Sequence, residues 1–295
     1  MATDLRAHSA QARRMFELAD ELTGLPVSRL CAEGPLDRLT ETDVAQPAVV
    51  ATSLAALAVL RERVELRSEA TAGHSVGEFA AYVAAGVLTP EDALRLVSTR
   101  AHAMASACKS VDGTMAAVIG LDEAALRAAC EAATHNGSSV ELANLNSPGQ
   151  LIVSGARDAI ERVAQQARAA GARRVLPLNV GGPFHSVYMR PAADVLAGAI
   201  AETTFKPAEV PVVLNASAQA TQDPQALRHE LVVQVYSPVR WIETLVCLAR
   251  LGCNRFLEIG PGQVLVGLVR RTLPDAKVAS FGSTGDLPAA EALIA

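Results

Sequence analysis

The chain has 295 residues, of which 50% are hydrophobic, and a formal net charge of −5 at neutral pH. A chain of this length and composition can bury a large core, in one big domain or in a big domain with a smaller insert. The acidic balance and an aromatic content of 3% exclude a general nucleic-acid binder, which needs a basic surface and aromatic stacking platforms.

The amino-terminal residues carry several charges and lack the apolar core of a signal peptide. No run approaches the roughly 18 uncharged apolar residues of a membrane span. The protein is therefore expected in the cytoplasm, without membrane contact. Its five cysteines show neither CxxC spacing nor nearby histidine pairs, so neither a disulfide framework nor a metal site is predicted.

Helical patterns alternate along the chain with short apolar runs that end in Gly or Pro. This alternation predicts an α/β fold with a largely parallel sheet. The first element expected is a helix over Ala7–Thr23.

The next feature is the sequence Gly-His-Ser-Val-Gly-Glu, a Gly-x-Ser-x-Gly nucleophile elbow with Ser75 at its apex. In such a sharp turn, Gly73 and Gly77 are expected where a Cβ would clash, and the serine hydroxyl is exposed. A helix predicted over Glu78–Ala85 then presents free N–H groups, that of Val76 first, to the oxyanion of a tetrahedral intermediate. The pattern predicts a covalent serine nucleophile; an ordinary glycine-rich turn is the alternative.

A second helix is predicted to begin at Thr89, an N-cap candidate, with Pro90 at its first position. Its apolar stripe contains Arg100. A buried guanidinium needs an anion, and three explanations are open. They are an ion pair within the core, a side chain that snorkels at the edge of the stripe, and a ligand carboxylate held by two hydrogen bonds.

Residues 113–180 show a different order of elements: strand, helix, two strands, helix and strand. This order is typical of a ferredoxin-like unit. The expected elements are Met115–Ile119, Asp122–Ala133, Val140–Leu145, Gln150–Gly155, Ala156–Ala170 and Ala172–Pro177. The remaining residues, 1–112 and 181–295, form the larger, catalytic domain in this interpretation, and the substrate is expected in a cleft between the two.

The loop Gly-Gly-Pro-Phe-His-Ser precedes a helix predicted over Val187–Ile200 and places His185 where it can face that cleft. A serine nucleophile requires a base near neutral pH, and His185 is the best placed of the six histidines. A structural role for this loop histidine is the alternative.

Several separated motifs occur in an order that resembles one known family. They are Gln46-Pro47, the serine hexapeptide, Arg100, the run from Asn144 to Gln150, Gly-Pro-Phe-His-Ser around His185, the run from Gln234 to Trp241, and the run from Glu258 to Gly262. Over nearly its whole length the chain resembles the malonyl-CoA:acyl-carrier-protein transacylases, the acyltransferase family of fatty-acid and polyketide synthesis. The resemblance implies an α/β-hydrolase-like core with a mostly parallel sheet and an inserted ferredoxin-like subdomain.

The resemblance also implies roles for the candidate residues. Ser75 would attack the thioester of malonyl-CoA and His185 would take its proton. The acyl group would then pass to the phosphopantetheine thiol of an acyl carrier protein in a ping-pong transfer. Arg100 would pair with the malonyl carboxylate and exclude acetyl groups, because these would leave a desolvated cation unpaired. Backbone carbonyls of Asn215 and Gln234 would orient the histidine in place of a triad aspartate. No cofactor is implied, and the protein is expected to be a monomer.

Phe184 resembles the malonyl-selecting form of its motif, in which the ring narrows the space beside the substrate α-carbon. Malonyl is therefore favoured over methylmalonyl, and a plain core aromatic is the alternative. Docking of an acidic carrier protein needs a basic surface, whereas a solvated helix face would explain the same charges. The candidates are Arg168, Arg173, Arg174, Arg270 and Arg271.

The amino terminus departs from the family pattern. Members open with a buried strand and a Phe-Pro-Gly-Gln-Gly-like turn that completes the oxyanion region, and this sequence enters its first helix directly. A central strand is therefore predicted to be missing, and loss of one oxyanion donor costs on the order of 10²–10³ in rate. A true start upstream of Met1 is the favoured interpretation; a degenerate member with weak activity is the other.

Two further functions stay open. The first is a serine hydrolase or acyl-unloading enzyme that uses the same Ser75–His185 pair but admits water. The second is a degenerate relative that binds carrier proteins. Arg100 separates the hydrolase from the transferase, because a general esterase has no use for a buried cation opposite its nucleophile.

Overall fold

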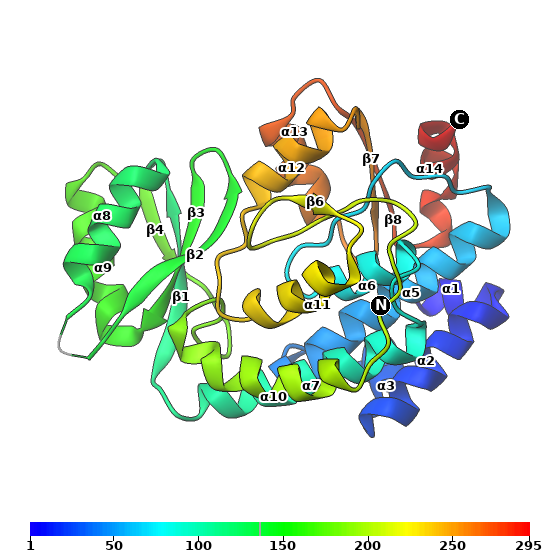
Figure 1. The fold of residues 1–295 in the computed structure, drawn as a ribbon, viewed down its shortest axis with the longest axis horizontal. Helices are drawn as coiled ribbons and strands as arrows, with labels where there is room; N and C mark the ends of the chain where they lie inside the picture. The colour runs from blue at the N-terminus through cyan, green and yellow to red at the C-terminus, as the bar shows by residue number, and fades with distance from the viewer. Residues whose placement is uncertain (136) are drawn as a thin grey trace.

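Helices dominate the first third of the chain, and a separate sheet lies in the middle of the sequence (Figure 1). The structure is a computed structural model that describes residues 1–135 and 137–295. It confirms the mixed α/β class. The amino-terminal helices are α1 (Thr3–His8), α2 (Ala10–Thr23), α3 (Val27–Glu33), α4 (Leu36–Leu39), α5 (Thr42–Arg63), α6 (Gly77–Ala84) and α7 (Pro90–Cys108).

The single helix predicted over Ala7–Thr23 is divided. Helix α1 ends at His8, and the hydroxyl of Ser9 accepts a hydrogen bond from the N–H of Ala12 at 3.1 Å. Serine caps a helix in this way because its side chain satisfies an N–H that has no partner within the helix. The cap therefore begins a new helix, α2, where periodicity alone suggested a continuous one.

The middle of the chain contains the six elements in the predicted order. They are β1 (Gly113–Ile119), α8 (Glu123–Ala133), β2 (Val140–Ser147), β3 (Gln150–Ala156), α9 (Arg157–Ala169) and β4 (Arg174–Pro177). The strands form one antiparallel sheet in the order β2-β3-β1-β4. Alternate residues of β1 face opposite sides, as the pleat requires. Val118 packs under α8 and α9, whereas Met115 and Ala117 face Phe184. Figure 1 shows this sheet at one end of the molecule and α1 to α3 at the other.

The last third of the chain returns to the helical part. Its elements are the 3₁₀ turn Val187–Met189, α10 (Arg190–Ala201), β5 (Val212–Val213), β6 (Ala220–Thr221), α11 (Pro224–Val233), α12 (Trp241–Arg250), β7 (Arg255–Ile259), α13 (Val264–Thr272), β8 (Lys277–Phe281), the 3₁₀ turn Thr284–Asp286 and α14 (Leu287–Ile294). The prediction of a largely parallel sheet needs correction. Within the described residues, β7 and β8 are the only strands that pair in parallel, and the largest sheet is antiparallel.

A cavity of about 1130 Å³ interrupts the parallel arrangement. It lies between the segment from Ala70 to Gly73, which leads into the serine turn, and strand β7. Thr71 bonds on its far side to the backbone of Pro211 and Val213, and no described residue bonds the backbone of Ala70 or Ala72. The cavity therefore separates two strand-like edges, the segment from Ala70 to Gly73 and strand β7.

Strand β7 offers a test of this interruption. Hydrogen bonds of 2.9 and 3.0 Å link Asn254 and Gly260 to β8, so alternation along a parallel ladder directs the N–H groups of Leu257 and Ile259 away from β8. The described residues offer these two groups no acceptor. We expect their amide hydrogens to exchange at least about tenfold faster than that of Glu258 between them, measured by NMR or residue-resolved mass spectrometry. Equal protection of all three amides would mean that the cavity is filled.

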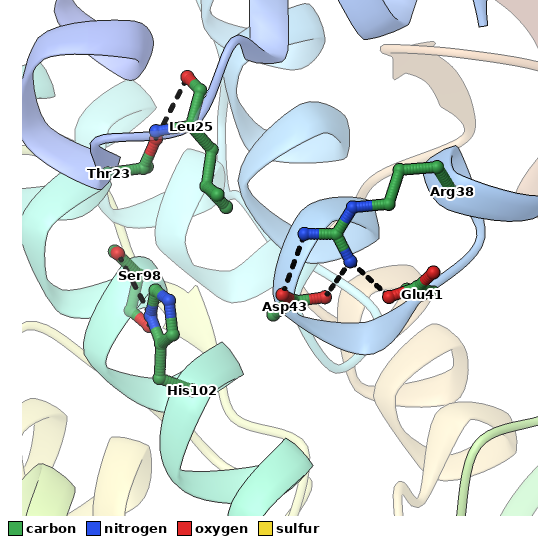
Figure 2. A network of polar contacts seen from close by, with 7 residues as sticks. All are labelled: Thr23, Leu25, Arg38, Glu41, Asp43, Ser98 and His102. Atoms are coloured by element: carbon green, nitrogen blue, oxygen red, sulfur yellow. Dashed lines mark hydrogen bonds and ion pairs between the residues drawn. The ribbon is translucent and has the colours of Figure 1, made fainter. Parts of the chain in front are cut away.

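Arg38 fixes the start of α5 (Figure 2). Its guanidinium donates to the two carboxylate oxygens of Asp43, at 3.3 and 3.2 Å, and to Glu41. Asp43 lies in the first turn of α5, where a carboxylate also suits the positive end of the helix. Gln46, in the next turn of α5, lies in the core and is 9% exposed.

Helix α5 is long and apolar enough to cross a membrane by length and composition, and it alone among the described helices meets that test. The prediction that no run approaches a membrane span is therefore corrected for this helix. In the structure, 72% of its most apolar stretch is buried inside the protein. Burial against α2 and α7 accounts for this composition, because a helix that is apolar all round belongs in a core.

Candidate active site

Ser75 occupies a strained turn between the segment ending at Gly73 and helix α6. Its φ angle is +51°, in the left-handed region that non-glycine residues seldom adopt. A Cβ on Gly73 would collide with the backbone of Gly77, which explains the first glycine of the motif. The expectation for Gly77 itself was wrong, since a Cβ there would meet no atom within 4 Å.

His185 lies beside the serine although the two residues are 110 positions apart in sequence. Its Nε2 is 2.7 Å from Ser75 Oγ. Its Nδ1 is 2.9 Å from the carbonyl oxygen of Gln234 and 3.1 Å from that of Ser237. Carbonyls only accept hydrogen bonds, so Nδ1 carries the proton and Nε2 is left free to accept the proton of the serine.

Asn215 holds the serine turn and does not orient His185. Its backbone carbonyl accepts from Arg240 N–H at 3.0 Å, and the carbonyls beside His185 Nδ1 are those of Gln234 and Ser237, so the structure does not show the expected contact with the histidine. Ser237 supplies the second carbonyl instead. The Asn215 side chain accepts from Ser75 N–H at 2.7 Å and donates to the carbonyl of Gly73 at 2.7 Å. The side chain points this way because residues 211–213 run alongside Thr71.

Arg100 projects from α7 into the same site. The helix begins as predicted, with the Thr89 hydroxyl accepting from Asp92 N–H at 3.1 Å. The Arg100 side chain is only 2% exposed. Its Nη2 lies 3.1 Å from Ser75 Oγ and 2.9 Å from the side-chain oxygen of Gln234, and its Nη1 donates to the side-chain oxygen of Gln46.

These partners decide between the explanations for the buried arginine. Every acceptor around Arg100 is neutral, and no carboxylate of the described residues lies within ion-pair distance. Its Nε is buried without any acceptor in the described part of the chain. A core ion pair and a snorkelling side chain are both excluded by this arrangement. A guanidinium held by amides beside a nucleophile is suited to receiving an anion from a ligand.

Burial controls the charge states of both groups. Burial first, and the charge of Arg100 second, lower the pKa of His185 from its ordinary value of 6.5 to about 3. Burial also lowers the pKa of Arg100 to about 10, which leaves the guanidinium charged at neutral pH. The free site therefore combines a neutral imidazole with a cation.

The low pKa of His185 predicts an unusual pH profile. The imidazole accepts a proton only when it is neutral, and a lowered pKa keeps it neutral as the pH falls. We expect kcat/KM for release of CoA from malonyl-CoA to lose less than about half its value between pH 7.5 and pH 5.5, whereas an unperturbed histidine would lose most of it. An Arg100→Met variant should shift the acid limb to higher pH, because the cation that lowers this pKa is gone. A half-maximal point near pH 6.5 in the unchanged protein would contradict the assignment.

Two other predicted residues lie close to the serine. Val76 follows it directly, and its backbone N–H has no partner among the described residues, so it remains available to a ligand. Phe184 is half-buried and packs where the middle sheet meets the helical part. The apolar contacts of Phe184 are those of a core aromatic at this junction.

Sequence reasoning missed several residues of the site. Gln46, Ser237 and Glu78 were present in the quoted motifs without an assigned role. The His74 side chain, next to the nucleophile in sequence, contacts the side-chain oxygen of Asn146 through its Nε2, at 2.8 Å. Each of these residues lies within one of the motifs that resemble the family, and this position was the one sign in the sequence that it belongs to the site.

Comparison with known proteins places this geometry in context. The family described as "Acyl transferase domain" matches residues 1–288. A Bacillus subtilis protein named malonyl CoA-acyl carrier protein transacylase is 41% identical over 271 residues, covering 92% of this chain and 85% of that protein. The structure of an acyl carrier protein S-malonyltransferase from Vibrio cholerae superposes with a TM-score of 0.94 at 37% identity, covering 98% of this chain and 94% of that one. A malonyl-transacylase solved in complex with a type II PKS acyl-carrier protein also has a TM-score of 0.94, at 38% identity and with the same coverage.

Proposed function

Because this chain belongs to the acyl transferase family, we propose that it transfers a malonyl group from malonyl-CoA to the phosphopantetheine thiol of an acyl carrier protein. One observation carries the proposal. The guanidinium of Arg100 is buried without a carboxylate partner among the described residues, 3.1 Å from the hydroxyl of Ser75, which in turn is 2.7 Å from His185 Nε2. A nucleophile, its base and an unpaired cation within one site suit an acyl group that carries its own carboxylate.

In the first half of the proposed reaction, Ser75 Oγ attacks the thioester carbonyl as His185 Nε2 takes its proton. The carbonyl oxygen becomes an oxyanion, which the N–H of Val76 is placed to stabilise. The intermediate collapses to the malonyl ester, the C–S bond breaks, and the imidazolium returns the proton to the leaving CoA thiolate. The carrier-protein thiol then attacks the ester by the same steps in reverse order.

Arg100 is the proposed selector for malonyl. The substrate carboxylate would pair with this guanidinium, which has no carboxylate partner among the described residues. Pairing would also balance the charge that lowers the pKa of His185, so the base strengthens when a dicarboxylic acyl group is bound. Phe184, by its position next to His185, is proposed to narrow the space beside the α-carbon, and its core packing is the alternative explanation.

One observation favours a second candidate. A cavity lies beside the segment leading to Ser75, and the backbone of Ala70 and Ala72 has no hydrogen-bond partner among the described residues, so a degenerate relative with weak activity is kept as that candidate. The hydrolase alternative is less well supported, because water as the acceptor gives the buried Arg100 no role.

We also propose how the chain divides into domains. Residues 1–112 and 181–295 are proposed as an α/β-hydrolase-like catalytic domain and residues 113–180 as a ferredoxin-like subdomain, supported by the strand order β2-β3-β1-β4. The protein is proposed to act as a cytoplasmic monomer without a cofactor. For the carrier protein, a docking surface is proposed from exposed arginines that border both parts: Arg168, Arg173, Arg174, Arg270 and Arg271.

The deciding experiment is the intact mass of the protein after brief exposure to malonyl-CoA, with acetyl-CoA in parallel. A malonyl-sized adduct formed only with malonyl-CoA, and released by holo acyl carrier protein, is the expected result. CoA release without an adduct would favour the hydrolase. No adduct and no CoA release would reject the transferase and favour the degenerate relative.

A further inference from the structure

Glu78 is a buried carboxylate that the proposed reaction leaves unused. It lies in the first turn of α6, three residues after the nucleophile, and its exposure is 0%. Burying a carboxylate is costly unless its oxygens are hydrogen-bonded. Both are: one accepts from Asn215 N–H at 2.8 Å, and the other from the side-chain amide of Gln234 at 2.6 Å.

The two residues bound by Glu78 are the ones that arrange the site. Asn215 brackets the serine turn through its bonds to Ser75 N–H and to the carbonyl of Gly73. Gln234 offers its backbone carbonyl to His185 and its side-chain oxygen to Arg100. One carboxylate thus supports both the nucleophile and the groups that orient its partners.

The hydrogen bonds of the Gln234 amide fix which of its ends faces Arg100. The NH₂ group of Gln234 donates both to Glu78 and, at 2.9 Å, to the carbonyl of Ser75. With both N–H bonds used, the amide can turn only its oxygen towards Arg100. If the amide rotated, its NH₂ group would face the guanidinium, and two donors would confront each other in a buried site.

We propose that Glu78 is a positioning residue that sets malonyl selectivity by fixing the orientation of the Gln234 amide against Arg100. This inference rests on the proposed function, because its readout is the preference for malonyl over acetyl groups. The same carboxylate accepts from the backbone N–H of Asn215, so one side chain fixes the position of the serine turn relative to Arg100.

The test is the isosteric variant Glu78→Gln. A glutamine has one oxygen, so it cannot accept from both Asn215 and Gln234, and the Gln234 amide is expected to rotate. We expect the malonyl-to-acetyl ratio of kcat/KM for ester formation to fall by about tenfold to a hundredfold, the range for a lost hydrogen bond to a charged group. A ratio unchanged within about twofold would overturn the inference.

Glu230 provides the matched control. It is also buried, at 3% exposure, and its side-chain oxygen accepts from Ala216 N–H at 2.7 Å. Its backbone carbonyl accepts from Gln234 N–H at 2.8 Å, a bond that the substitution keeps, and its carboxyl group has no hydrogen bond to the Gln234 side chain. Glu230→Gln makes the same isosteric change from carboxyl to amide and keeps an oxygen for the Ala216 N–H. Its ratio should stay within about twofold of the unchanged protein. An equal fall in both variants would show a general effect of altering a buried carboxyl group and would overturn the proposal.

A double-mutant cycle tests the route through Gln234. In a Gln234→Ala background, which keeps the backbone carbonyl for His185, Glu78→Gln should change the ratio by less than about twofold. Additive effects would overturn the inference. If Glu78→Gln does not fold, Gln234→Ala alone should lower the ratio by the same factor, and an unchanged ratio would again overturn it. Failure of the unchanged protein to form any malonyl ester would instead reject the proposed function.

Discussion

Replacing Ser75 by alanine is expected to lower the rate of CoA release from malonyl-CoA on the order of 10⁴-fold or more, because no other group near His185 can form the ester. The fold should persist. Alanine retains the backbone N–H that donates to Asn215 at 2.7 Å, and the turn, with φ at +51°, loses only a hydroxyl. Rapid-quench or coupled measurement of CoA release gives the rate, and intact mass gives the ester.

The control for this variant is substrate binding. Malonyl-CoA should bind the Ser75→Ala protein with a Kd within about tenfold of the unchanged protein, because Arg100 and the N–H of Val76 remain. Isothermal titration calorimetry measures this. A malonyl adduct on the alanine variant would place the nucleophile elsewhere and contradict the assignment.

Replacing Arg100 by methionine is the second change with a large expected effect. Methionine keeps an unbranched apolar stem in the core and removes the guanidinium. We expect kcat/KM for malonyl-CoA to fall about 10²–10³-fold, the cost of removing one partner from a buried charge pair. Acetyl-CoA should be used as well as before or better, because it no longer leaves a cation unpaired beside the ester.

Arg95 supplies the control on the same helix. Its side chain is 56% exposed and pairs with Asp92 at 2.9 Å. Exposed ion pairs contribute little, so Arg95→Met should change either substrate's kcat/KM by less than about twofold. A similar loss in the two variants, or an equal loss with malonyl-CoA and acetyl-CoA in Arg100→Met, would reject Arg100 as the selector.

The local features of the site follow from short stretches of sequence. The serine turn depends on Gly73, where any side chain would strike the backbone of the following helix. The start of α7 depends on Thr89 and Pro90, and the order of elements in the middle sheet follows from the period of its apolar residues. Each of these signals acts between residues close in sequence, which is why the pattern of residue types predicts it.

The candidate site also contains relations between distant residues that the sequence could not supply. The side chain of Gln234 reaches the backbone of Ser75 across 159 positions, and Asn215 was expected to act through its carbonyl but acts through its amide. The cavity beside β7 likewise depends on how segments that are distant in sequence pack together.

The sequence by itself therefore determined the residue types of the site: a serine on a glycine-bounded turn, a loop histidine and an arginine in an apolar stripe. Only the tertiary structure decided which atoms meet. It surrounded Arg100 with neutral amide oxygens and with no carboxylate of the described residues within ion-pair distance. It also placed both oxygens of Glu78 on the residues that hold the nucleophile and orient its base. The physical reason is that hydrogen bonds are short and directional, so their partners depend on how whole elements dock, which the periodicity of a single element does not encode.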